Sequence, residues 1–356
     1  MSPQHIVNLS GGKDSQACAL LAAERGMPFR LVMADTGNEN ELTIEHAHYL
    51  AEFVGVPLEM VRYDFTEKMA KKRTFIALEW ANAGVPPSRI ERALEIIQPT
   101  GIPFLDLCLW KGRFPSARAQ FCTEFLKARA IEDHVVSPAL KVGPVVQWIG
   151  VRRDESPNRR NAQMFQRVRR DGPHDMLLFR PLIHWKAQNV ISYATAVGAK
   201  HNPLYSLGMG RVGCFPCVNV NKAEIGQIAI RFPETEDKLR EWEVLVADAS
   251  KRGAATFFAA DMTPEGADLV RALNRMVEHT IRSNHRDLLE DGREVELHRM
   301  GRKIRRDLSA SIEWPKADAA FAWSKTDHGG RQLNMLRHAF EADDGLSCSS
   351  QYGLCE

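Results

Sequence analysis

The chain has 356 residues, with 47 Lys and Arg against 45 Asp and Glu, so its formal net charge is only +2. This length predicts two domains, or one large α/β domain with an appendage. The balance of charge excludes a general polyelectrolyte attraction, so nucleic-acid binding would need local clusters. No apolar run approaches the roughly 20 residues of a membrane span, and the chain starts with a strand pattern and not a signal segment. We therefore expect a cytoplasmic protein with no membrane partner.

A strand, a glycine turn and a helix follow one another at the start of the chain. Residues 5–9 form an apolar β-type run, residues 10–15 read SGGKDS, and residues 16–23 continue as an apolar helix. Such a turn places backbone N–H groups and the positive end of the helix at one point, which predicts a phosphate site. Its spacing is neither that of the nucleoside-triphosphate P-loop nor that of the dinucleotide fingerprint. The expected ligand-binding residues are Ser10, Gly11, Gly12, Lys13 and Ser15.

The next elements predict a doubly wound parallel sheet. Residues 29–34 and 58–62 read as strands, and residues 41–54 between them have helical periodicity. A β-α-β-α-β succession is typical of an α/β fold with helices on both faces. Asp35 begins a polar loop directly after the second strand, at the sheet edge where such folds bind ligands.

Residues 66–98 have a helical pattern that Pro86 and Pro87 divide, with Ser88 as the predicted N-cap of the second part. We interpret residues 66–111 as a helical insertion that covers the site. The elements expected next are a helix at 121–136, a strand at 145–149, an arginine-dense loop at 152–170, a strand at 177–179 and a helix at 186–197. The arginines of that loop predict bidentate recognition of phosphate or sulfate.

Beyond residue 218 the pattern is mainly helical. Helices are predicted at 222–231, 236–252 and 265–284, so residues 1–218 are expected to form the nucleotide-binding domain and 219–356 a helical C-terminal region. Residues 299–306 contain five basic side chains, which predict either a solvated helix face or a polynucleotide contact.

The seven cysteines suggest a metal centre and not a disulfide framework. Cys18 and Cys108 lie in apolar segments and are expected in the core. Cys214 and Cys217 form a C-x2-C turn, and the pair Cys348 and Cys355 lies in the C-terminal tail. Four thiolates suit either zinc or a [4Fe–4S] cluster, and the residues alone do not choose between these metals.

Several separated motifs resemble the phosphoadenosine phosphosulfate (PAPS) reductase family of the PP-loop ATP pyrophosphatase superfamily, over about the first two-thirds of the chain. The matching segments are SGGKDS from Ser10, DTGNEN from Asp35, R-x3-C-T-x3-K from Arg118, GVRRDES from Gly150, PL-x2-W from Pro181, NPLY from Asn202 and GC-x2-C from Gly213. The resemblance implies a PP-loop α/β fold, an adenine nucleotide on the turn and sulfur chemistry nearby.

Two departures separate this sequence from the assimilatory reductases. Its PP-loop is intact, whereas theirs is degenerate, and its tail ends Tyr352-Gly353-Leu354-Cys355-Glu356 where they carry Glu-Cys-Gly-Leu-His. It is more similar to iron–sulfur members that cleave ATP, such as the enzymes of DNA phosphorothioation. The resemblance then implies ATP with Mg²⁺, and a sulfur donor such as a cysteine desulfurase.

In this chemistry a substrate oxygen attacks the α-phosphorus of ATP, pyrophosphate leaves, and sulfur displaces the adenylated oxygen. Lys13 is expected to stabilise the leaving group, while Asp14 and Asp35 organise metal or the attacking group, Asp14 also being a candidate helix cap. The resemblance adds Gly150, Arg152 and Arg153 to the nucleotide site, with Arg153 also catalytic.

The resemblance favours iron–sulfur over zinc and adds Cys122 to the candidate ligands. One ligand set is Cys122, Cys214, Cys217 and one tail cysteine, which leaves the other tail cysteine, such as Cys355, as a sulfur carrier. The alternative set is the two pairs, with Cys122 free in the active site.

Three functions compete at this point. The first is ATP-dependent sulfur transfer to DNA or RNA, the second is reduction of an adenylyl or phosphoadenylyl sulfate, and the third is a non-catalytic nucleotide-binding subunit of a modification or defence complex. The sequence leaves a homo-oligomer open.

Overall fold

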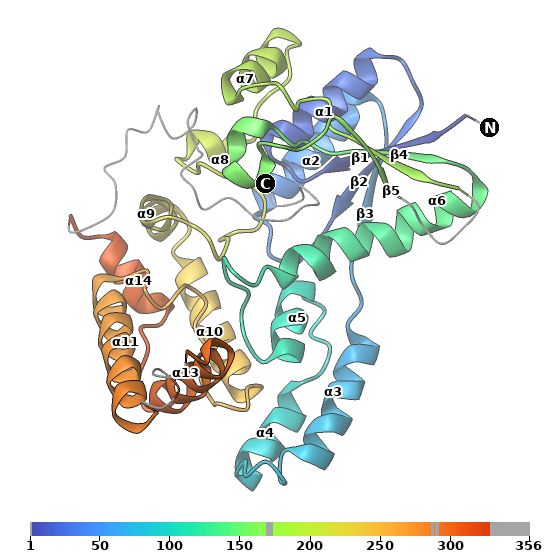
Figure 1. The fold of residues 1–356 in the computed structure, drawn as a ribbon. Coiled ribbons are helices and arrows are strands. Elements are labelled where there is room, and N and C mark those ends of the chain that lie inside the picture. The colour runs from blue at the N-terminus through green and yellow to red at the C-terminus, as the bar shows by residue number, and fades with distance from the viewer. Residues whose placement is uncertain (1, 169–173, 286–287, 289–291, 328–356) are drawn as a thin grey trace.

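The computed structural model describes residues 2–168, 174–285, 288 and 292–327 (Figure 1). Its centre is a six-stranded sheet in the order β3-β2-β1-β4-β6-β5. All neighbours are parallel except β5, which runs antiparallel to β6. The strands are β1 Gln4–Leu9, β2 Phe29–Ala34, β3 Leu58–Val61, β4 Val145–Trp148, β5 Phe165–Val168 and β6 Met176–Phe179. The predicted doubly wound PP-loop α/β fold is confirmed.

Helices surround the sheet and continue beyond it. The α-helices are α1 Lys13–Glu24, α2 Glu41–Val54, α3 Thr66–Glu79, α4 Pro87–Ile96, α5 Pro103–Lys111, α6 Ser137–Val142, α7 Ala187–Ala196, α8 Pro203–Ser206, α9 Lys222–Arg231, α10 Glu234–Asp248, α11 Pro264–Asn284, α13 Glu294–Ser309 and α14 Ala317–Ser324. Before α6 the chain forms wide, π-type helical turns, η1 Thr123–Arg129 and η2 Glu132–Val136. None of the helices within these described ranges is long and apolar enough to span a membrane.

The two faces of the sheet are covered by different helices because successive strand side chains point to opposite sides. Val7 and Leu31 pack on α1, α2 and α7, whereas Ile6 and Val32 pack on η2 and α6. Cys18 lies in the first of these clusters with no exposed surface, and Cys108 is equally buried in α5. Their predicted role as core residues is confirmed.

The chain reverses its direction of winding between β1 and β4, the two central strands. β2 and β3 lie on one side of β1, and β4 and β6 lie on the other. In open α/β sheets the loops that leave two such strands diverge and leave a crevice at their carboxyl ends. The loops after Leu9 and Trp148 therefore define the expected ligand site.

The insertion packs against the C-terminal helices. α3, α4 and α5 share one hydrophobic cluster with α9, α10 and α14, and Figure 1 shows these helices together on the side away from α7. Glu243 reinforces the cluster by accepting hydrogen bonds from the N–H groups of Phe257 and Ala317. α5 reaches the loop after β2, where the Phe104 N–H donates to the Thr36 carbonyl over 2.8 Å. The division of the chain at residue 218 stays a prediction.

Two local predictions are wrong. Ser88 does not cap α4, because the helix already begins at Pro87, whose fixed φ suits a first helical position, and Pro86 is the N-cap. The segment 152–170 is not a simple loop, because it contains two short 3-10 turns and the edge strand β5. Phe165 anchors this strand by stacking on Phe179, with 4.6 Å between ring centroids.

Candidate active site

The turn after β1 is closed by its own serines. Ser15 Oγ donates to the Gly12 carbonyl over 2.9 Å and accepts from the Ser10 N–H over 3.1 Å. Gly11 has φ +80°, and a Cβ there would lie 2.3 Å from Thr43 Cγ2, so both conformation and space require glycine. Gly12 has φ −84° and precedes the first residue of α1. The predicted strand-turn-helix is confirmed.

The segment Asn202–Tyr205 braces this turn from α8. Asn202 Nδ2 donates to the Gly11 carbonyl over 3.1 Å, and the Lys13 N–H donates to the Tyr205 hydroxyl over 2.9 Å. The tyrosine therefore satisfies one of the N–H groups at the start of α1, which otherwise lack intrahelical partners.

A buried ion-pair network fixes the start of α1 to the segment after β4. Arg152 Nε lies 2.6 Å from Asp14 Oδ1, and Lys13 Nζ lies 3.2 Å from Asp14 Oδ2. Asp14 has no exposed surface and Arg152 is 2% exposed. Arg152 also pairs with Asp154, and Arg159 pairs with Glu155. Asp14 and Arg152 are therefore ion-pair partners. Each of the two buried arginines in this network has at least one acidic partner.

A cavity lies at the crevice between β1 and β4. It is lined by Asn8, Leu9, Ser10, Ser15, Met33, Ala34, Glu39, Lys127, Ile131, Ile149, Gly150 and Gly213. Three of the predicted nucleotide-binding residues line it, namely Ser10, Ser15 and Gly150. Gly11, Gly12 and Lys13 form the adjoining turn. We call this space the nucleotide cavity, after the ligand that the sequence predicts at the adjoining turn.

Gly150 and Asn8 contribute to this cavity in different ways. A Cβ on Gly150 would lie 2.7 Å from the Asp14 carbonyl carbon, so this glycine lets the loop after β4 approach the start of α1. Asn8 is 5% exposed, and its Oδ1 accepts from Gln147 Nε2 over 3.2 Å. Its Nδ2 has no hydrogen-bond partner in the described part of the chain. A buried donor without a partner costs free energy, and a bound acceptor would recover that cost.

Two other predicted residues lie outside the nucleotide cavity. Asp35 follows β2 as expected, but its Oδ2 lies 2.6 Å from Arg62 Nη2 and its Oδ1 accepts from the Gly37 N–H. Arg153 is exposed, and its guanidinium donates to the Ala162 carbonyl over 3.0 and 3.1 Å. Their catalytic roles stay predictions.

Three cysteines line a second cavity beside the first. Cys122, Cys214 and Cys217 share its wall with residues of the 209–220 segment and of α9, and we call it the cysteine cavity. The loop that carries Cys214 is held against the loop after β2, since the Phe215 N–H donates to the Asn38 carbonyl and Asn38 Nδ2 donates to the Pro216 carbonyl. Two segments far apart in the sequence therefore meet at the predicted sulfur site.

Lys127 and Gly213 line both cavities. Burial lowers the pKa of Lys127, whereas negative charge on Cys214, Cys122 and Glu39 raises it, and the net shift is upward. Burial raises the pKa of Glu39. Lys127 thus places a positive charge where a phosphate in one cavity and a thiolate in the other would both meet it.

The thiols themselves are suited to a cation. Burial, followed by the neighbouring Cys214 and Cys217, raises the pKa of Cys122 to about 12, and burial also raises the pKa of Cys214. Both side chains are therefore neutral thiols at pH 7 even beside Lys127, and a bound metal would supply the further positive charge that deprotonates them.

Only three of the five cysteines predicted to bind a metal lie within the described residues. Across residues 2–327, less the gaps given above, no group of three or more His, Cys, Asp or Glu side chains is arranged to hold a metal ion. Cys348 and Cys355 lie outside the described residues. The three thiols share one cavity, and both four-cysteine ligand sets stay predictions.

Three site residues were not among the predicted ones: Asn8, Glu39 and Lys127. Glu39 and Lys127 belong to the DTGNEN and R-x3-C-T-x3-K segments, so their motifs were visible but their roles were not. Asn8 is a polar residue near the carboxyl end of the strand, after two apolar residues. The carboxyl ends of parallel strands form the sheet edge where ligands bind, so its position was a visible signal.

The chain is similar to known proteins in sequence and in fold. Residues 4–220 match the family model described as phosphoadenosine phosphosulfate reductase domain. The chain is 38% identical over 363 residues to the "Uncharacterized 37.8 kDa protein in gpa 5′region" of Escherichia phage 186, covering 99% of this chain and 96% of that protein. It is 32% identical over 73 residues to adenosine 5′-phosphosulfate reductase 1 of Bacillus subtilis, covering 20% of this chain and 30% of that enzyme.

Among solved structures, the fold is similar to that of the PAPS reductase from Candida auris in its phosphate complex. The TM-score is 0.39 and the identity 15%, covering 61% of this chain and 84% of the other.

Proposed function

The chain belongs to the phosphoadenosine phosphosulfate reductase family, and from this premise we propose that it is an ATP-dependent sulfur-transfer enzyme that acts on nucleic acid. The observation that carries the proposal is the contact between the nucleotide cavity and the cysteine cavity, which share Lys127 and Gly213. A phosphate-activating site and a thiol site that share one cation are suited to couple activation with sulfur transfer.

ATP is the nucleotide that the intact turn favours. Ser10 and Ser15 line the cavity wall, where the Ser15 hydroxyl donates to the Gly12 carbonyl and so holds the turn at the positive end of α1. We place the adenylate phosphorus near these groups, with Asn8 Nδ2 as a further donor and Mg²⁺ offsetting the phosphate charge. Lys127 then stabilises the negative charge that develops when pyrophosphate leaves.

The reaction has two displacements. A substrate oxygen attacks the α-phosphorus of ATP and releases pyrophosphate, which leaves an adenylated substrate. Sulfur from the donor then attacks the activated position, and the C–O or P–O electrons leave with AMP. When the donor is a cysteine desulfurase, the attacking sulfur is a persulfide. A second thiol then cleaves the S–S bond, which releases the sulfur on the substrate and leaves a disulfide that an external thiol reduces. Lys127 lines both cavities, so its ammonium group can stabilise the negative charge on the leaving pyrophosphate and on the attacking sulfur.

A [4Fe–4S] cluster is the metal centre that we propose for the cysteine cavity. Cys122, Cys214 and Cys217 would supply three thiolates and a tail cysteine, Cys348 or Cys355, the fourth. When bound, such a cluster supplies an electron-transfer or sulfur-binding centre beside the activated substrate. Zinc is the alternative for the same thiolates.

The metal is tested by anaerobic purification followed by iron, sulfide and zinc analysis. We expect iron and acid-labile sulfide in the wild-type protein and their loss in Cys214→Ala. The matched control is Cys18→Ala, since Cys18 is buried in the core on α1, lines neither cavity and should leave the metal content unchanged. Stoichiometric zinc without iron would remove the cluster from the account.

The second candidate is reduction of a sulfonucleotide, which the family and the identity to adenosine 5′-phosphosulfate reductases favour. Sulfite release from adenylyl or phosphoadenylyl sulfate, without AMP formation from ATP, would replace the first proposal with this one.

A further inference from the structure

The C-terminal region contains a helical hairpin with two different surfaces. α11 and α13 pack along a seam of Leu273, Val277 and Ile304, flanked by Met300 and Leu308. Because these apolar residues occupy one side of α13, its other side is left to polar groups. The seam explains how the hairpin is held together and leaves the opposite surface unexplained.

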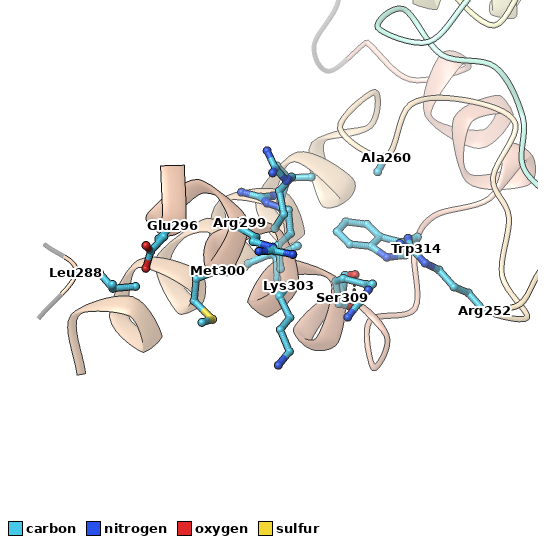
Figure 2. A pocket seen from close by; sticks show the side chains of 14 residues that line it. Arg252, Ala260, Leu288, Glu296, Arg299, Met300, Lys303, Ser309 and Trp314 are labelled. Carbon is cyan, nitrogen blue, oxygen red and sulfur yellow. Dashed lines mark hydrogen bonds between the residues drawn. The ribbon is translucent and has the colours of Figure 1, made fainter. Parts of the chain in front are cut away.

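An open groove runs along α13, and Figure 2 shows it from close by. Leu273 and Met300 of the seam form part of its wall, and charged side chains of α13 form another part. Its charged lining is unbalanced, because six basic residues face one acidic residue. The basic residues are Arg252, Arg299, Arg302, Lys303, Arg305 and Arg306, and the acidic one is Glu296. We call this the α13 groove.

The local acids do not neutralise the groove. Glu296 already pairs with Arg293, which does not line it. Arg306 lies 3.3 Å from Asp307, in a pair that is more than half exposed and therefore weak. Arg299, Arg302 and Lys303 have no ion-pair partner in the part of the chain that the structure describes, and all three are exposed.

This arrangement costs stability. Arg299 lies three residues before Arg302 and four before Lys303, and Arg302 lies four before Arg306, so like charges face each other on adjacent helical turns. Such pairs are unfavourable in the isolated protein. An anionic partner would turn the same charges into favourable contacts, which makes the groove a binding surface and not simply a solvated face.

An aromatic ring completes the groove. Trp314 lines it, and Figure 2 shows its indole near Ser309 and Arg252. The residue is half-buried because it also packs against the α11–α13 seam. A fixed ring within a basic groove can stack on an unpaired base, and such platforms distinguish single strands from duplexes, whose bases are already stacked.

We propose that the α13 groove binds single-stranded nucleic acid, with the arginines and lysine on the phosphates and Trp314 on a base. This inference rests on the proposed function and names the surface that holds its substrate. The basic residues from 299 to 306 span about 10 Å of helix, which matches about three steps, and so about four phosphates, at the 3.4 Å rise of a stacked strand.

The test is fluorescence anisotropy of labelled oligodeoxythymidine, titrated with the full chain at several salt concentrations. Wild-type binding should weaken steeply with salt. In Arg302→Glu/Lys303→Glu the slope of log affinity against log salt should fall in magnitude by about 1.4 or more, because each lost phosphate contact removes about 0.7. The matched control, Lys71→Glu/Lys141→Glu, changes net charge equally at exposed sites on α3 and α6 and should keep the wild-type slope.

Trp314 is tested with two replacements. Trp314→Leu should weaken binding about fivefold or more, while Trp314→Phe, which keeps a ring, should lose less. Equal slopes for the two double variants, equal affinity for the single strand and its duplex, or no loss in Trp314→Leu would each overturn the proposal.

A separate measurement distinguishes failure of the groove from failure of the proposed function. Labelled ATP is added to the wild-type protein, and AMP is followed alongside strand binding. AMP formation without salt-dependent strand binding would overturn the groove alone. Strand binding with no AMP formation would overturn the ATP-dependent function and leave the groove in place.

Discussion

Replacing Arg152 with Gln tests whether the buried network holds the phosphate-binding turn in place. Arg152 Nε lies 2.6 Å from Asp14 Oδ1, and Asp14 is the second residue of α1. Gln keeps part of the volume and removes the charge. Asp14 would then keep its contact with Lys13 but lose its guanidinium partner.

The burial of the pair sets the expected magnitude. Exposed ion pairs contribute at most about 1 kcal/mol, whereas removing one partner of a buried pair costs about 3–5 kcal/mol because the other charge stays out of water. Asp14 is fully buried and Arg152 is 2% exposed, so the second range applies. We expect Arg152→Gln to lower the free energy of unfolding by about 3 kcal/mol or more.

Urea unfolding followed by circular dichroism measures this change, with ATP affinity as a second readout. The control is Arg167→Gln, in the same segment, because its pair with Asp175 is exposed. It should change stability by less than about 1 kcal/mol. If Arg152→Gln cost no more than Arg167→Gln, the claim that this pair fixes the turn would be wrong.

Three further predictions concern the same region. Asn8→Ala should weaken ATP binding about fivefold, because Nδ2 would donate to the ligand, and should cost about 1–3 kcal/mol of stability, because Gln147 Nε2 loses its acceptor; equal affinities by calorimetry would refute the first part. Gly150→Ala should cost roughly 1–3 kcal/mol in urea unfolding, since its Cβ would lie 2.7 Å from the Asp14 backbone; wild-type stability would contradict that geometry. Burial, with a smaller contribution from His201, lowers the pKa of His46 to about 4. The unfolded chain, with a normal histidine pKa, binds more protons below about pH 6.5, so stability falls as pH drops toward 4. His46→Gln should therefore reduce the loss between about pH 7.5 and pH 5 by roughly 2 kcal/mol, and an unchanged loss would place the pKa near its usual value.

The central strands could be predicted because they are short apolar runs that end in turn residues. The strand β2, Phe29–Ala34, has the predicted bounds, and so does the helix α2, Glu41–Val54, which follows it. β5 could not be predicted in the same way, because Phe165–Val168 lies on the sheet edge, is mostly exposed and contains an arginine. Its pairing with β6 depends on contacts such as Phe165 on Phe179, which no local pattern reveals.

The site was predictable where one segment supplies the geometry. The glycine turn follows from local backbone requirements, and Cys214 and Cys217 follow from their spacing. The burial of Arg152 against Asp14 was not predictable, because the two residues are 138 positions apart and a charged loop is ordinarily solvated. The position of Lys127 between the two cavities likewise depends on how η1 packs beside the Cys214 loop.

The most direct test of the account is the fate of ATP labelled at the α-phosphorus and, in a parallel reaction, at the γ-phosphorus, incubated anaerobically with the full chain, Mg²⁺, a sulfide donor and a single-stranded oligonucleotide. We predict AMP and pyrophosphate in equal amounts, with much slower formation in Lys127→Gln, because this residue lines both cavities. Formation of ADP, no turnover by protein with its metal intact, or an undiminished rate in Lys127→Gln would contradict the claim that the two cavities form one site for activation and sulfur transfer.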